Sequence, residues 1–277
     1  MSNLTMFLFL LLAGFALGGV AQAGTADGAS DPAIVAADTA VRLGVTAGYA
    51  HYQENISPRD TEAGALIGFT GSVRALWPGG FAGYALPDLY ADVEYDFSAG
   101  SLGYNGNLNN KAQTAYDTHD NAYYNDVVVR LGMGRPLSGG REIIPYVAGG
   151  YQNWYRNIGG PSGYGAYYSA GLIGGGLRLD IAANRALVLS ASAEGMAVVN
   201  GSVSVPYQNF NGAFGASMEE RISLDADYRL NDAWHAYAGL GVTHYSYTGS
   251  KPSARGLFEP LSDTVQVSSM FGLAYGF

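Results

Sequence analysis

His244 and Ser246 are the residues of this chain best placed for nucleophilic chemistry, because only Tyr245 separates them. A histidine within hydrogen-bonding reach of a serine removes the hydroxyl proton, and a carboxylate that orients the ring completes such a site. Glu259 lies downstream and is the candidate for that carboxylate. The pattern predicts a hydrolytic site only if the fold brings the three side chains together. Histidine and tyrosine at this spacing are also typical of a membrane interface, where aromatic residues gather without a catalytic role.

Three acidic residues, Asp92, Glu94 and Asp96, alternate along one segment and offer a different chemistry. Paired carboxylates can act in acid–base catalysis if a base is placed beside them. No histidine follows an acidic pair near the end of the chain. We therefore expect these carboxylates to form ion pairs with arginines.

A third group, Asp117, His119 and Asp120, lies in a segment rich in Asp and Asn. Carboxylate oxygens are ligands for hard cations such as Ca²⁺. Polar segments of this kind are, however, usually solvated loops. We predict neither a metal nor a cofactor.

The elements that must position these residues are strands. In residues 264–277 an apolar row alternates with a small or polar row, which suits a strand between lipid and a barrel lumen. The apolar row consists of Val265, Val267, Phe271, Leu273, Tyr275 and Phe277. Phe271, Leu273, Tyr275 and Phe277 resemble the C-terminal signal that the bacterial outer-membrane assembly machinery recognises.

The composition agrees with a membrane barrel. Charged residues make up 13% of the 277 residues, whereas soluble domains carry about a quarter. Beyond the N-terminus, no segment approaches the roughly 20 apolar residues that a membrane helix needs. The chain has no cysteine, which excludes a disulfide framework, and its net charge of −9 argues against nucleic-acid binding.

Alternation of this kind predicts an all-β fold, a transmembrane antiparallel up-and-down β-barrel. Short and long links alternate between the segments, as they do between periplasmic turns and outer loops. Ten strands fit best; eight would require merging two segments, and twelve a hidden pair in the long link 98–123. The ten predicted strands are 41–53, 64–77, 88–97, 124–135, 143–156, 167–181, 186–198, 213–230, 234–247 and 264–277.

The N-terminus reads as a targeting segment. Residues 1–23 contain an apolar run and end in Val20-Ala21-Gln22-Ala23, a small-x-small cleavage site, so we predict a secretory signal peptide. Residues 24–40 are small and polar and predict a flexible periplasmic leader. Residues 41–277 would form the barrel.

Many charged residues fall on the predicted inner face of the strands, and we call them the lumen charge network. A bare charge in a narrow lumen is costly, so we expect ion pairs that largely plug the barrel. The alternative is a narrow pore whose acidic excess favours cations. The network consists of Arg42, Arg74, Asp92, Glu94, Asp96, Asp126, Arg130, Arg178, Asp180, Glu194, Glu219, Arg221, Asp225, Asp227 and Arg229.

Three stretches carry a family resemblance. They resemble segments of uncharacterised proteobacterial outer-membrane β-barrel proteins, of the opacity and omptin-like barrel class, and consist of residues 144–157 (IPYVAGGYQNWYRN), residues 234–239 (WHAYAG) and the closing Ala274-Tyr275-Gly276-Phe277. The resemblance implies a barrel in the outer membrane of a Gram-negative bacterium and supplies no catalytic or ligand residue. His244-x-Ser246 is similar to the motif of outer-membrane lipid A deacylases, but Tyr247 and Thr248 depart from that pattern.

The sequence thus predicts a non-enzymatic outer-membrane barrel that acts through extracellular loops. The alternatives are a small cation-preferring porin and a lipid A deacylase-like enzyme. The expected partners are outer-membrane lipid and lipopolysaccharide, the outer-membrane assembly machinery and an unknown extracellular ligand.

Overall fold

The computed structural model describes residues 29–79, 88–108 and 113–277. The predicted signal peptide and the first part of the predicted leader, residues 24–28, lie outside the described residues. None of the helices in the described part of the chain is long and apolar enough to span a membrane.

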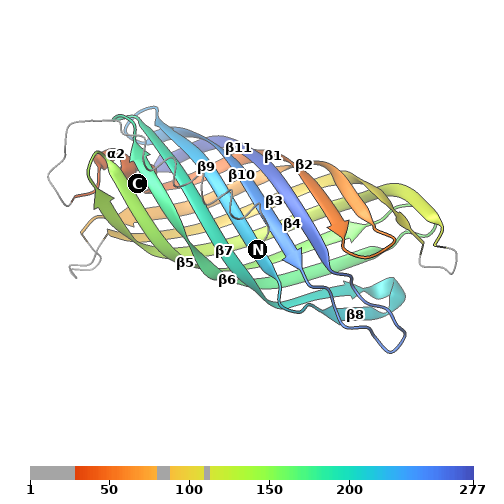
Figure 1. Cartoon of the computed structure of the whole chain (residues 1–277). Helices are drawn as coiled ribbons and strands as arrows, with labels where there is room; N and C mark the ends of the chain where they lie inside the picture. Colours follow the sequence, from red (N-terminus) through yellow and green to blue (C-terminus); the bar gives the residue numbers. More distant parts are fainter. Residues whose placement is uncertain (1–28, 80–87, 109–112) are drawn as a thin grey trace.

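Ten long antiparallel strands close into a transmembrane β-barrel, as the alternation predicts (Figure 1). Each strand pairs with the next along the chain, and β1 pairs with β11 to close the wall. The strands are β1 (Ala40–Glu54), β2 (Thr61–Trp77), β3 (Asp88–Asn107), β4 (Ala115–Leu137), β5 (Arg141–Asn157), β6 (Gly165–Ala182), β7 (Leu187–Val205), β9 (Met218–Arg229), β10 (Trp234–Tyr247) and β11 (Ser262–Gly276). A short strand, β8 (Phe210–Ala213), follows the 3₁₀ turn η1 (Pro206–Gln208) and pairs with the end of β7.

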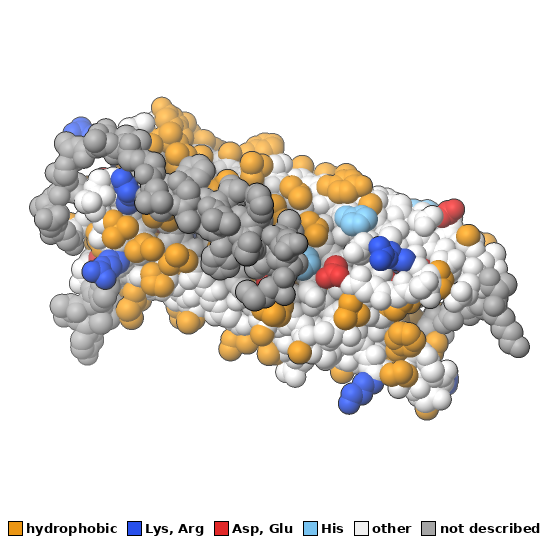
Figure 2. All heavy atoms as spheres, in the orientation of Figure 1, with side chains coloured by type: hydrophobic (Ala, Val, Ile, Leu, Met, Phe, Trp, Pro, Cys, Tyr) orange, Lys and Arg blue, Asp and Glu red, His pale blue; other side chains and the backbone are white. Residues whose placement is uncertain are grey.

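The outer surface of the barrel is apolar. Ile67 is 72% exposed, Leu43 67% and Val147 66%, because these side chains point away from the lumen at alternate positions. Figure 2 shows hydrophobic side chains over much of the visible outer wall. A closed wall with this surface satisfies every backbone group in lipid.

Strand β5 has aromatic residues on both faces, so the sequence alone does not decide which of its residues face the lumen. The structure resolves it: Tyr146 is buried in the lumen, and Val147 and Tyr151 are exposed on the outside. The same phase places Gln152 and Arg156 inside, where both are buried.

Several predicted boundaries differ from the structure. Residues 98–123 are mostly not a loop, because β3 and β4 continue to the pair Asn107 and Ala115. Beyond the apolar belt both faces of a strand can be polar, so the alternation of hydrophobicity ends before the hydrogen-bonded ladder does. Most of the predicted strand 213–230 is β9, which begins only at Met218, and only Ala213 belongs to β8. Strand β7 extends to Val205.

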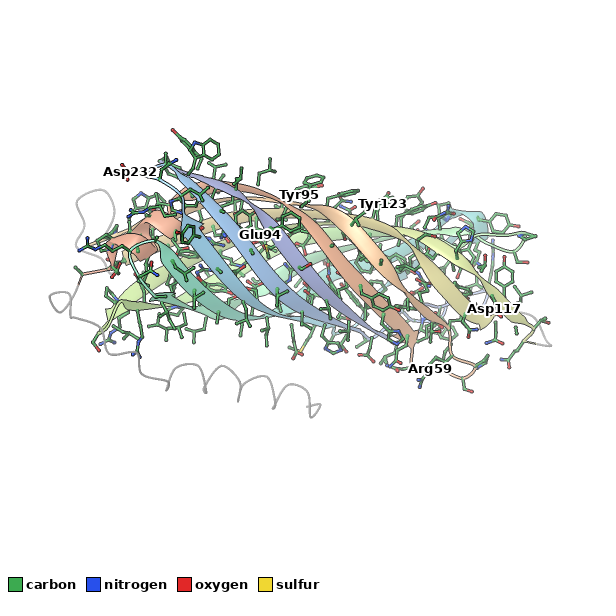
Figure 3. All side chains as sticks on the ribbon, turned by 90° about the horizontal axis from the view of Figure 1, so that it is seen from above. Arg59, Glu94, Tyr95, Asp117, Tyr123 and Asp232 are labelled. Atoms are coloured by element: carbon green, nitrogen blue, oxygen red, sulfur yellow. The ribbon has the colours of Figure 1, made fainter. Side chains whose placement is uncertain are left out.

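A short helix, α2 (Pro32–Ala37), lies in the barrel at the end where β1 begins and β11 ends, which we call the α2 end (Figure 1). Asp31 caps the helix by accepting a hydrogen bond from the backbone N–H of Ala33 at 2.8 Å, and Pro32 occupies the first turn. The predicted flexible leader is therefore ordered from 32 to 37. We call the opposite end, which carries β8, the loop end; Figure 3 shows Asp232 at the α2 end and Arg59 and Asp117 at the loop end.

Candidate functional site

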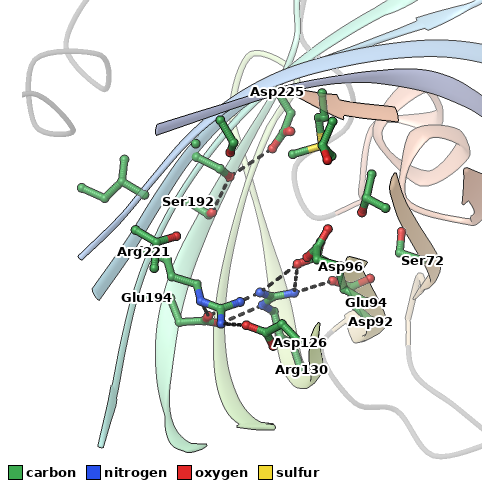
Figure 4. Close-up of a pocket in the computed structure, with 18 of the residues that line it drawn as sticks. Ser72, Asp92, Glu94, Asp96, Asp126, Arg130, Ser192, Glu194, Arg221 and Asp225 are labelled. Atoms are coloured by element: carbon green, nitrogen blue, oxygen red, sulfur yellow. Dashed lines mark hydrogen bonds and ion pairs between the residues drawn. The ribbon is translucent and has the colours of Figure 1, made fainter. Parts of the chain in front are cut away.

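The lumen contains a polar chamber of about 200 Å³ near its middle (Figure 4). Its lining includes five arginines and six carboxylates of the lumen charge network. These are Arg42, Arg74, Arg130, Arg178, Arg221, Asp92, Glu94, Asp96, Asp126, Glu194 and Asp225. Eleven of the fifteen members of the lumen charge network therefore gather around one space.

Arg130 on β4 connects three strands at one side of this chamber. Its guanidinium lies 3.0 Å from Asp92, 3.3 Å from Glu94 and 2.7 Å from Glu194. Because the three carboxylates come from β3 and β7, Arg130 links strands that lie on either side of β5 and β6. A charge this enclosed is stable only with such partners.

Arg221 on β9 forms the second centre of the network. It pairs with Asp126 and Glu219 and lies 3.9 Å from Glu194, which it shares with Arg130. Glu219 is fully buried. Arg130, Arg221 and the Glu194 that they share all line the chamber.

At the α2 end, an apolar cluster and Asp38, which follows α2, lie inside the barrel. Ile34 is fully buried; with Ala33 and Ala37 it packs in a cluster with four residues of the barrel wall: Leu76, Tyr90, Ile144 and Val188. Asp38 pairs with Arg74 at 3.2 Å and with Arg178 at 3.1 Å. Burial raises the pKa of Asp38, but the opposing charges of Arg178 and Arg74 outweigh it and hold the pKa below its usual range.

Sequence reasoning missed Asp38 because it assigned residues 24–40 to a flexible leader. The signal that would have found it is the pair Asp31-Pro32, since an N-capping residue followed by proline marks a helix start. A helix of six residues gives too short a periodicity to be recognised otherwise.

At the loop end, aromatic rings pack around a buried arginine. Trp154 and Tyr168 stack with centroids 4.8 Å apart, and Tyr247 lies 5.3 Å from Trp154. Arg156 lies 4.5 Å from the centroid of the Tyr52 ring and donates to the Tyr168 hydroxyl at 2.9 Å.

Arg156 pairs with Glu62 inside the barrel and lies 4.0 Å from Glu259. Glu259 belongs to the link between β10 and β11, and it accepts a hydrogen bond from the Tyr168 hydroxyl at 3.0 Å. Burial is the largest effect on Glu259 and raises the pKa of this carboxyl, against the opposing charge of Arg156. Arg156 and Glu62 were not singled out from the sequence, since the phase of β5 was open and Glu62 precedes the predicted strand.

Three members of the lumen charge network, Asp96, Asp225 and Arg229, take part in no ion pair among the described residues. Asp225 accepts a hydrogen bond from Ser223 at 3.2 Å.

Other members of the network are paired. Asp180 pairs with Arg178 at 2.8 Å. Asp227 lies 3.8 Å from Arg42 and 2.6 Å from the Nδ1 of His235, a buried histidine.

The three candidate hydrolytic residues do not converge. His244 lies among residues of the outer face, 3.4 Å from Glu220 and 3.3 Å from Asp263. Ser246, two residues along β10, is opposite Asp263 in the ladder. Glu259 contacts Tyr168 and Arg156 inside the barrel, so it does not orient His244. Both ring nitrogens of His244 face carboxylates, and no hydrogen bond joins it to Ser246 in the described chain.

The candidate cation ligands are also separated. Asp120 is fully buried inside and accepts from the backbone N–H of Asn157 at 2.5 Å, whereas Asp117 pairs with Asn105 on the exposed face. Their alternation along β4 explains the split, because successive side chains point to opposite faces. Within the described residues, no three His, Cys, Asp or Glu side chains are grouped so that they could hold a metal ion.

The fold and lumen define the class: a closed ten-stranded membrane barrel with a charged interior. No protein-family model matches the sequence, and a search of curated proteins finds no match.

Solved structures resemble the chain in outline. The outer membrane protease OmpT from Escherichia coli is 13% identical, with 93% of this chain and 99% of that chain covered and a TM-score of 0.49. The transport unit of the autotransporter AIDA-I from Escherichia coli is 10% identical, with 86% and 90% covered and a TM-score of 0.46. The outer membrane protein OprG from Pseudomonas aeruginosa is 12% identical, with 88% and 99% covered and a TM-score of 0.31. At these identities and TM-scores none of them assigns an activity to this chain.

Proposed function

We propose that this protein is a non-enzymatic barrel of a Gram-negative outer membrane, closed to ions, whose role lies in surface contacts at its loop end. The observation that carries the proposal is that buried side chains occupy the lumen at both ends. Ile34 and Asp38 fill the α2 end, and Arg156, Trp154 and Tyr168 fill the loop end. The α2 end would face the periplasm, and lipid and lipopolysaccharide would surround the apolar belt.

Planar-bilayer conductance of the refolded protein tests the closed lumen. A shift of gel mobility on heating first shows that the barrel is folded. From such protein we expect no discrete conductance steps. Discrete steps with cation-selective reversal would overturn the proposal and favour the small cation-preferring porin, with the lumen carboxylates as its filter.

Exposed apolar residues at the loop end support the surface role. Tyr207 in η1 is 86% exposed, and Phe258 in the link before β11 is 47% exposed. Isolated aromatic side chains held on ordered loops provide contact area at low cost in conformational entropy. We expect an extracellular partner to contact these two residues.

The surface role is tested by attachment of cells that express the barrel to polysaccharide-coated and matrix-coated surfaces. We expect the double variant Tyr207→Ser, Phe258→Ser to reduce attachment at least several-fold. Leu137→Ser, which changes an exposed apolar residue where β4 ends, is the matched control and should leave attachment unchanged. Equal attachment by all three proteins would contradict the surface role.

A further inference from the structure

Three arginines at the α2 end lie on the outside of the barrel rather than in the lumen. Arg135 follows the exposed Met133 on the outer face of β4, and Arg141 begins β5 in phase with the exposed Val147. Arg185 lies in the link between β6 and β7. Arg135 and Arg185 are exposed, and Arg141 is partly exposed. The three side chains therefore lie where the apolar outer surface of the wall ends.

The register of the strands brings these arginines together. Arg141 is opposite Leu137 in the ladder, and Arg135 lies two residues before Leu137 on the same face. Residues related in this diagonal way are about 7–8 Å apart, within reach of long side chains. On its other side Arg141 is opposite Ile181, and Arg185 follows in the turn after that strand. Like charges this close repel each other unless an anion lies between them.

No such anion comes from the described part of the chain. None of the three guanidinium groups forms a hydrogen bond or an ion pair with another described residue. Glu142 and Asp180, which are near them in the sequence, are fully buried inside the barrel. By contrast, each of the five arginines that line the chamber has at least one carboxylate partner. The outer arginines are thus available to a partner from outside the barrel.

Two links at the α2 end have the same construction but carry opposite charges. In each, an asparagine side chain accepts hydrogen bonds from the backbone N–H groups two and three residues further along, at 2.8–3.0 Å. The asparagines are Asn184 before β7 and Asn231 before β10. The residue that follows is Arg185 in the first link and Asp232 in the second (Figure 3). Because the turn accommodates either charge, its geometry does not require an arginine at position 185.

We propose that Arg135, Arg141 and Arg185 form a binding surface for the headgroup of an anionic phospholipid. A guanidinium group binds phosphate oxygens through two parallel N–H donors, and it keeps its charge at any physiological pH. The phosphate would lie among the three guanidinium groups, and the acyl chains would lie against Met133 and Leu131 on the outer face of β4.

The neighbouring surface favours a lipid over a free phosphate ion. Figure 2 shows basic side chains at the α2 end beside the hydrophobic side chains of the wall. Basic clusters at the edge of an apolar membrane surface attract anionic lipid headgroups. The inference rests on the proposed function, in which the α2 end faces the periplasm, so that the bound lipid belongs to the periplasmic leaflet.

Native mass spectrometry of the refolded barrel tests this surface with two lipids of the same acyl chains, phosphatidylglycerol and phosphatidylcholine. We expect the unchanged barrel to retain several-fold more phosphatidylglycerol than phosphatidylcholine. The triple variant Arg135→Gln, Arg141→Gln, Arg185→Gln should lose this preference. Equal retention of the two lipids by the unchanged barrel would overturn the proposal.

The matched control changes three exposed basic residues of the loop end, where no phospholipid surface is proposed. It is the triple variant Arg59→Gln, Lys251→Gln, Arg255→Gln, which alters the net charge by the same amount. We expect this control to keep the preference for phosphatidylglycerol. An equal loss in both triple variants would show that net charge alone attracts the lipid, and the assigned surface would be wrong.

Thermal unfolding of the unchanged barrel gives a measurement that needs no variant. A ligand that binds only the folded state raises the melting temperature. We therefore expect this temperature to rise as phosphatidylglycerol replaces phosphatidylcholine in lipid-doped micelles, and the rise to shrink at high salt. An unchanged melting temperature, or an equal rise with inorganic phosphate alone, would overturn the proposal. Conductance and cell attachment do not involve these arginines, so either outcome would leave the closed lumen and the surface role standing.

Discussion

Both ends of the lumen join a carboxylate outside the strands to a buried arginine, but they do so differently. At the α2 end, Asp38 lies 3.2 Å and 3.1 Å from two guanidinium groups. At the loop end, Glu259 lies 4.0 Å from one guanidinium, and its hydrogen bond is to the Tyr168 hydroxyl. The α2 end is held by charge, and the loop end is held mainly by packing of rings.

The pKa values of the two carboxyls follow from this difference. Arg178 and Arg74 overcome the effect of burial and lower the pKa of Asp38, whereas burial dominates at Glu259 and raises its pKa. The ionised form of Asp38 stabilises the barrel, and ionisation of Glu259 opposes folding. Lowering the pH therefore removes the stabilising charge of Asp38 at the α2 end, and it relieves the unfavourable charge of Glu259 at the loop end.

The largest effect is expected from Asp38→Ala. The change leaves Arg74 and Arg178 buried beside each other without the carboxylate that they share, and removal of one partner from a buried ion pair costs about 3–5 kcal/mol. Urea unfolding of the refolded barrel measures this loss of unfolding free energy. Asp232→Asn is the exposed control; an equally small loss in both variants would contradict the importance of the Asp38 ion pairs.

A loss of about 2–5 kcal/mol is expected for Ile34→Ala, from the range measured for large-to-small changes in protein cores. Ile34 is fully buried, so the smaller side chain leaves a cavity between α2 and the wall. Limited proteolysis should then cleave α2 while β1 to β11 stay protected. Resistance of α2 to the protease would show that the apolar cluster does not hold it.

Glu259→Gln should cost less than about 1.5 kcal/mol, because the amide oxygen can still accept from Tyr168. Its signature is in the pH dependence. Folding raises the pKa of Glu259 above its ordinary value of 4.5. As the pH rises from 4.5 through the raised pKa, this group therefore lowers the unfolding free energy.

The unchanged barrel should therefore lose unfolding free energy over that window relative to Glu259→Gln. Asp38 gives the opposite sign: its contribution is complete above its ordinary pKa of 3.8 and declines as the pH falls below that value. Parallel pH profiles of the unchanged barrel and Glu259→Gln would contradict the assignment at the loop end.

The smallest effect is expected from Ser246→Ala, which belongs to neither end. Ser246 lies on the outer face, and the nitrogens of His244 are directed at Glu220 and Asp263. Mass spectrometry of lipid A from expressing cells should show unchanged acylation. A loss of deacylation in this variant would establish the enzymatic alternative.

Much of the barrel could be predicted because a strand between lipid and lumen imposes a period of two on its sequence. Arg130 and Glu194 fell on the correct face for that reason. The continuation of β3 and β4 to Asn107 and Ala115 could not be predicted, since polar residues on both faces carry no such period.

The contacts of Asp38 and Glu259 at the two ends were harder to predict. Asp38 and Glu259 lie outside the strands, so alternation says nothing about where their side chains point. Glu259 reaches the lumen because its link folds back over the mouth, which places Leu257 against the cluster of Tyr168 and Val203. Contacts of this kind depend on tertiary packing, which no local pattern specifies.

The position of α2 also constrains the order of assembly. The helix precedes β1 in the chain, yet its contacts come from Leu76 on β2, Tyr90 on β3, Ile144 on β5 and Val188 on β7. Arg178 on β6 must also be in place before Asp38 can pair with it. The helix therefore cannot complete its contacts before β7 is in place, and protection of α2 from a protease reports that the strands from β2 to β7 have assembled around it.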